Sequence, residues 1–110
     1  MVLPNAARAF VEPSKVRDYL LSLSHPVGRF KAAVFSALGY HYEHWEVLRD
    51  DLLALVQVGE AVLGQPSPFG RKFEVDGVLI GPSGRSAPFR TVWIVRAETE
   101  VPRFVTAFPR

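Results

Sequence analysis

The 110-residue chain contains no cysteine and only one methionine. Without cysteine it can form no disulfide framework, no thiolate nucleophile and no cysteine-ligated zinc finger. No run approaches the roughly 20 consecutive apolar residues that a membrane-spanning helix needs, which excludes a transmembrane protein and indicates no association with a membrane. The first ten residues contain Pro4, Asn5 and Arg8 and lack the apolar core of a signal peptide, so we expect a cytoplasmic protein.

The composition is that of one globular domain. Hydrophobic residues make up 48% of the chain and charged residues 22%, which supplies enough apolar surface to offset chain entropy. We expect a single domain over residues 1–110, because two domains would each be too short to bury a core. The net charge is +2, and arginine supplies ten of the 13 positive charges. Arginine suits phosphate binding, but a GC-rich genome or thermal adaptation explains the excess more simply.

Helical periodicity dominates the first half of the chain. Apolar residues recur at helical spacing after Pro13, which predicts a short first helix that ends near residues 24–26. Ser24 is expected to be the N-cap of a second helix, which Gly39 ends. A third helix is expected from about Glu43 to the region of Gln57. Residues 59–70 are rich in glycine and proline and are expected to form a connection.

Strand periodicity dominates the second half. Apolar and polar residues alternate from about 69 to 80, and two more strands are expected at 89–95 and 103–108. The short connections between them predict an antiparallel meander. The expected fold class is α+β, with about three N-terminal helices packed on a C-terminal antiparallel β-meander of three or more strands. We expect Trp93 and Phe35 to lie in the core.

The histidines are the first candidates for chemistry. His41 and His44 lie three residues apart at the start of the expected third helix, but the further ligands of a zinc site are missing. His25 lies at the start of the second helix, where the helix dipole favours a neutral imidazole that can act as a base. Lys31 and Arg29 follow on the same helix, and such a helix start can bind phosphate. Alternatively, His25 only caps the helix and Lys31 is solvated.

Polar residues on the last two strands provide a second set of candidates. If the helices cover only one face of the sheet, polar side chains on the other face can form a substrate surface. The alternative is a solvated face held together by cross-strand pairs. The residues expected on this surface, opposite His25 and Lys31, are Arg90, Thr91, Arg103 and Thr106.

Several motifs resemble those of a known bacterial family of uncharacterised, toxin-like domains. The motifs lie at residues 3–6 (LPNA), 25–28 (HPVG), 31–32 (KA), 38–39 (LG), 69–75 (FGRKFEV), 81–84 (GPSG), 91–94 (TVWI) and 102–106 (PRFVT), with Phe35 between the third and fourth. Members of this family occur as stand-alone proteins and as C-terminal modules of polymorphic-toxin and phage-head-associated proteins. The layout is also similar to that of the ribonuclease group of barnase, RelE and colicin-type toxins. One departure is Phe30, where the commoner pattern has a basic residue or histidine.

The resemblance implies a metal-independent ribonuclease toxin of a toxin–antitoxin pair, with a small antitoxin-like protein and RNA as its partners. No cofactor and no metal are expected, and the oligomeric state is left open. The alternative is a non-catalytic partner-binding or RNA-binding module that uses the exposed sheet face. The catalytic residues implied are His25, Lys31, Arg90 and Thr106, and the substrate-binding residues are Arg29, Lys72, Thr91 and Arg103.

Overall fold

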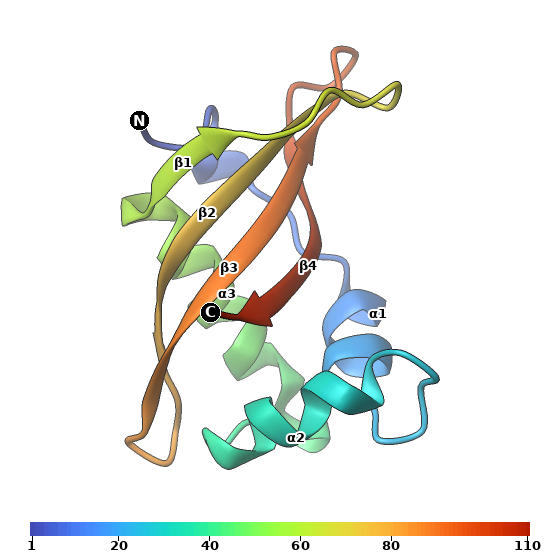
Figure 1. Cartoon of the computed structure of the whole chain (residues 1–110), viewed down its shortest axis with the longest axis vertical. Helices are drawn as coiled ribbons and strands as arrows, with labels where there is room; N and C mark the ends of the chain where they lie inside the picture. Colours follow the sequence, from blue (N-terminus) through green and yellow to red (C-terminus); the bar gives the residue numbers. More distant parts are fainter.

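Helices come first along the chain and strands last, as the change of hydrophobic period predicts. The computed structural model describes residues 1–110 and places the helices behind one face of an antiparallel sheet (Figure 1). The α+β expectation is therefore confirmed. The helices are α1 (Pro13–Lys15), α2 (Arg29–Ala37) and α3 (Trp45–Val58), and the strands are β1 (Glu60–Leu63), β2 (Arg71–Ile80), β3 (Ser86–Val95) and β4 (Pro102–Pro109).

The sheet has four strands in the order β1-β2-β3-β4, and each pairs antiparallel with its neighbour. The expectation that residues 59–70 form only a connection is wrong, because β1 lies within them. Ala61 and Leu63 of this strand pair with Val75 and Phe73 of β2. Four residues between Gly59 and Gly64 are too few for an alternating pattern to stand out in the sequence.

The core lies between the helices and the sheet. Leu48, Leu52 and Val56 of α3 are fully buried beneath the sheet. Phe35 of α2 stacks on Phe89 of β3 with ring centroids 5.1 Å apart. Phe35 and Trp93 both have no solvent-exposed surface, so the expected placement of these two aromatic residues in the core is confirmed.

The helix boundaries near residue 24 differ from expectation. After α1 the chain makes a single π turn, η2 (Val16–Leu20), in which the Leu21 N–H donates to the Val16 carbonyl. The first helix therefore ends earlier than predicted. The second begins at Arg29, several residues after Ser24, so the predicted N-cap is wrong. Its end is as predicted, because Gly39 has φ +95°, in the left-handed region.

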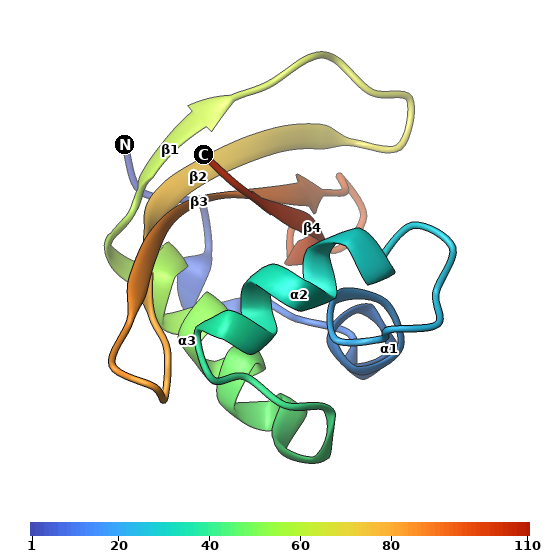
Figure 2. The same cartoon turned by 60° about the horizontal axis from the view of Figure 1, so that its bottom comes forward.

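The face of the sheet that the helices leave uncovered is called here the open face. It carries alternate residues of the strands, since successive side chains of a strand point to opposite faces. Strand β4 forms one edge of the sheet, and Figure 2 shows α2 lying beside β4 with α1 next to it. None of the helices is both long and apolar enough to cross a membrane.

Candidate functional site

A pocket opens where η2, α2 and the segment before α2 meet the edge strand β4. We call it the site pocket, and its volume is about 490 Å³. It brings His25 and Lys31 together with Thr106, as the sequence predicts, although Thr106 comes from the opposite end of the chain. The pocket is lined by Lys15, Tyr19, His25, Val27, Lys31, Val105 and Thr106.

Lys31 is fixed by hydrogen bonds at the centre of this pocket. Its Nζ donates to Thr106 Oγ1 at 2.7 Å and to the Tyr19 hydroxyl oxygen at 2.8 Å. The Tyr19 and Thr106 oxygens are 3.4 Å apart, so the three groups form a closed triangle. Lys31 is therefore not the solvated lysine of the alternative interpretation. An ammonium group has three N–H donors, which leaves one for a ligand.

Tyr19 is a site residue that the sequence did not indicate as one. Partial burial raises the pKa of its hydroxyl, but hydrogen bonds with Lys31 and Thr106 and the positive charges of Lys31 and Lys15 outweigh that effect. The net result is a pKa below the ordinary value. The hydroxyl of Tyr19 therefore gives up its proton more readily than a solvated tyrosine does.

The ring of His25 closes the turn that leads into α2. The unprotonated Nδ1 accepts the backbone N–H of Val27 at 3.0 Å and that of Gly28 at 2.9 Å. The neutral ring therefore carries its proton on Nε2 and can only donate there. These bonds hold the turn before α2, whose own N-cap is Gly28, and the expected role of His25 as a base does not fit them. The ring packs edge-on against Tyr19, with centroids 5.1 Å apart.

Thr91 does not lie on the open face. Its side chain is completely buried, where its hydroxyl donates to the Val75 carbonyl at 2.7 Å and accepts from Trp93 Nε1 at 2.8 Å. The expectation of a substrate contact by Thr91 is therefore wrong. The physical reason is the alternation of a strand, because Arg90 and Thr91 are neighbours and must point to opposite faces.

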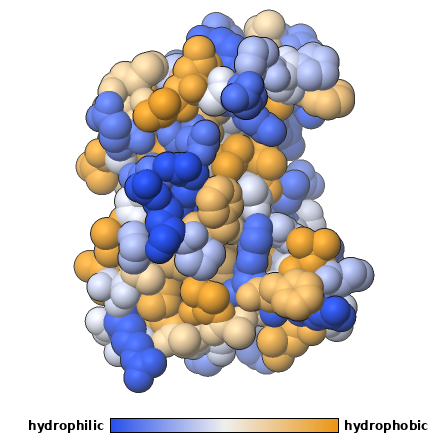
Figure 3. All heavy atoms as spheres, in the orientation of Figure 1, coloured by the Kyte–Doolittle hydropathy of each residue, from blue (hydrophilic) through white to orange (hydrophobic).

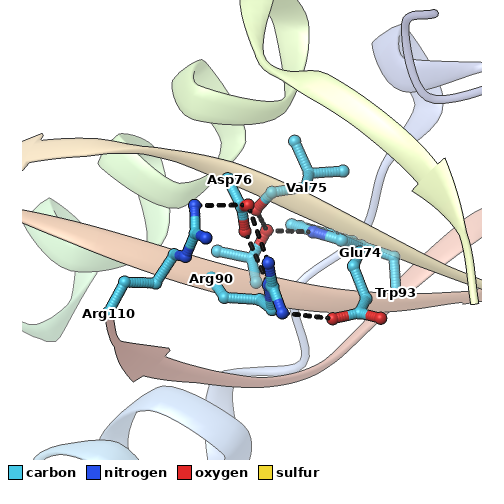
Figure 4. A network of polar contacts seen from close by, with 7 residues as sticks. Glu74, Val75, Asp76, Arg90, Trp93 and Arg110 are labelled. Carbon is cyan, nitrogen blue, oxygen red and sulfur yellow. Dashed lines mark hydrogen bonds and ion pairs between the residues drawn. The ribbon is translucent and has the colours of Figure 1, made fainter.

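Arg90 lies on the open face, within a network of charged side chains (Figure 4). It donates to both carboxylate oxygens of Asp76, at 2.8 and 3.0 Å, and lies 3.2 Å from Glu74. Arg110 bonds to the same Asp76 at 2.7 Å. Figure 3 shows the hydrophilic cluster that results over β2 and β3. The four charges cancel, so Arg90 adds no net positive charge to this face.

Arg90 is nevertheless close to the site pocket. Thr106 pairs with Val92 on β3, and Arg90 is two residues before Val92 on the same face. Such diagonal neighbours have Cα atoms about 7–8 Å apart.

The hydrogen bonds with Arg90 and the charges of Arg90 and Arg110 lower the pKa of Asp76, although partial burial opposes this shift.

The other expected substrate contacts lie outside the site pocket. Arg103 is on the open face of β4, where it pairs with Glu12 at 3.5 Å and covers the ring of Phe10. Lys72 lies on β2 and lines a different hollow, next to the β1–β2 connection. Arg29, at the start of α2, lies over the exposed ring of Phe30.

No group of three or more histidine, aspartate or glutamate side chains converges in a way that could hold a metal ion. His41 and His44 belong to no such group. The lack of a resident metal remains a prediction about the active protein.

The chain belongs to the family described as "Domain of unknown function (DUF6883)", whose model matches residues 2–110. This agrees with the expected membership of a family of uncharacterised domains. No curated protein matches the sequence. The fold is similar to that of a chain in a contact-dependent growth inhibition toxin–immunity protein complex from Klebsiella pneumoniae 342. The TM-score is 0.73 and the identity 20%, over 96% of each chain, which shows a shared fold.

Proposed function

We propose that this protein is a toxin-like endoribonuclease that cleaves RNA by acid–base chemistry at the site pocket. The observation that carries the proposal is the direct bond between Lys31 and a tyrosine of lowered pKa. The similarity in fold to a chain of a toxin–immunity protein complex supports a toxin-like role. It also supports a small antitoxin-like protein as the partner.

Cleavage through the ribose 2′-hydroxyl needs a proton acceptor, a proton donor and a cation beside the phosphate. When it is ionised, the Tyr19 oxygen takes the 2′-hydroxyl proton, and the 2′-oxygen forms a bond to phosphorus while the bond from phosphorus to the 5′-oxygen breaks. Lys31 gives a proton to the 5′-oxygen as it leaves. The proton on Tyr19 then passes to Lys31 along their 2.8 Å hydrogen bond, which restores the starting state.

The remaining groups bind and orient the substrate. The Nε2–H of His25 donates to a phosphate oxygen, in place of the role as a base expected from the sequence. Thr106 accepts from Lys31 and fixes the direction of its free N–H. Arg90 contacts the RNA on the open face next to Thr106, and the charge of Lys31 stabilises the phosphate as negative charge develops there.

The test is inducible expression in a bacterium that lacks the partner, followed by analysis of total RNA. The wild-type protein should arrest growth and fragment RNA. Lys31→Met should lower the cleavage rate of purified protein by at least about 100-fold, because it removes both the acid and the cation. Arg85→Met, which removes an equal charge from the β2–β3 turn, should keep the wild-type rate.

Three outcomes contradict the proposal. If wild-type protein binds RNA in a salt-dependent way without cleaving it, the chain is an RNA-binding module. If it neither binds nor cleaves RNA, a partner-binding module that uses the open face is the better explanation. Equal loss of cleavage in Lys31→Met and Arg85→Met would show that net charge, and not the site pocket, determines the rate.

A further inference from the structure

A second hollow of about 430 Å³ lies beside the site pocket, further along β4. We call it the flanking hollow. It shares Lys15 and Val105 with the site pocket. Val105 lies where the register between β3 and β4 shifts, so that Phe104 pairs with Trp93 and Thr106 with Val92. The other residues that line the hollow are Phe10, Glu12, Phe69, Ile94, Arg96, Arg103 and Phe104.

The flanking hollow contains more positive than negative charge. Lys15 and Arg96 form no ion pair, and the only carboxylate in its lining is that of Glu12. Glu12 pairs with Arg103 at 3.5 Å, and both side chains are about half exposed. Such an exposed pair contributes little and is easily replaced by a stronger ligand of the guanidinium group. Three cations facing one carboxylate favour an anionic ligand.

The flanking hollow also has an exposed aromatic ring beside a free arginine. Phe69 lies in the connection between β1 and β2 and is 68% exposed. Arg96 directly follows β3, and both residues also line an adjoining hollow, so the two are neighbours. A phenylalanine ring and a guanidinium plane are the groups on which proteins stack unpaired bases.

We propose that the flanking hollow binds the nucleotide of a single-stranded RNA that adjoins the one in the site pocket. Its base stacks on Phe69, and its phosphates lie against Arg96, Arg103 and Lys15. An acidic peptide would use the same cations but has no base to stack on Phe69, so the exposed ring favours RNA. The inference rests on the proposed ribonuclease function, because it assigns part of that enzyme's substrate.

Binding of a fluorescently labelled, single-stranded 2′-O-methyl RNA of about eight nucleotides tests the proposal without cleavage. Phe69→Ser should weaken binding about tenfold, since stacking on one base is lost. The matched control is Phe30→Ser on α2, whose ring is 70% exposed and lies outside both hollows; it should bind as the wild type does. Arg96→Gln should reduce the slope of log K against log salt by about 0.7, while Arg85→Gln should not change it.

Equal affinities for Phe69→Ser and Phe30→Ser would overturn the proposal. So would binding of polyglutamate with no binding of the 2′-O-methyl RNA, which would assign the hollow to an acidic protein partner. Failure of the ribonuclease function is distinguishable from these results. In that case the wild-type protein cleaves no RNA, yet Phe69→Ser still weakens binding of the uncleavable oligonucleotide. If RNA is cleaved but Phe69→Ser binds normally, only the flanking hollow is refuted.

Discussion

At the scale of single residues, the site pocket depends on a lysine and a tyrosine that modify each other. Lys31 donates to the Tyr19 hydroxyl at 2.8 Å and favours its ionised form. We expect Lys31→Met to raise the pKa of Tyr19, because burial, which already acts in that direction, is then less opposed. Titration of the tyrosine ¹³Cζ signals by NMR measures the shift. The acid limb of any remaining cleavage activity should move to higher pH with it, because Tyr19 acts as the base and must be ionised.

Lys15→Met is the matched control for this titration. Lys15 acts on Tyr19 through its charge alone, and this is the smallest of the contributions to the shift. The Lys15 variant should therefore move the Tyr19 pKa less than the Lys31 variant does. A shift of equal size in both would mean that the hydrogen bond has no part in lowering the pKa.

Residue identity predicts part of this site and not the rest. The polar residues His25, Lys31 and Thr106 stand out within otherwise apolar motifs, and all three line the site pocket. Tyr19 could not be identified in this way, because it lies at an apolar position of a helical pattern and its hydroxyl meets Lys31 only through the fold. The role of His25 depends on two backbone N–H groups that no spacing in the sequence reveals.

At the scale of elements, α2 is placed by close contact with η2. A Cβ atom at Gly28 would overlap the carbonyl oxygen of Tyr19, although the backbone at Gly28 has φ −61°, which any residue can adopt. Helix propensity would stabilise Gly28→Ala by up to about 1 kcal/mol. We expect the opposite sign, a loss of about 1–3 kcal/mol, because the overlap forces the two turns apart. Urea unfolding measures the change, and RNA cleavage should fall with the displacement of Tyr19.

Gly64→Ala is the control for this contact, because its Cβ would lie 3.4 Å or more from other atoms. Its effect should stay within about 0.5 kcal/mol. Stabilisation by Gly28→Ala would show that helix propensity outweighs the packing of α2 against η2. The sequence predicts a first helix after Pro13 and the end of the second at Gly39, but not the contact between η2 and the start of α2. A period of 3.6 residues does not specify which turns approach each other.

At the scale of the whole molecule, the sequence predicts the layers better than the connections. The long alternating strands β2 and β3 and the apolar stripe of α3 are strong periodic signals, and they define the α+β class. Strand β1 is short, and the π turn at η2 has a period that differs from that of an α-helix. The sequence pattern therefore predicts neither element. The site pocket lies beside η2, where the local pattern is least regular.

The arrangement of the whole molecule also predicts the chemistry of the products. Proton transfer is assigned to Tyr19 and Lys31, and no cluster of carboxylates or histidines could position metal ions on a phosphate. We therefore expect cleavage to persist in excess EDTA and to leave a 2′,3′-cyclic phosphate and a 5′-hydroxyl, because the attacking oxygen comes from the RNA itself. Labelling of the new 5′ ends by a kinase, without prior removal of phosphate, measures this outcome.

RNA with 2′-O-methyl groups should stay intact although it binds. Cleavage that EDTA abolishes and that leaves 5′-phosphates would instead require metal-activated water, and the roles given to Tyr19 and Lys31 would then be wrong.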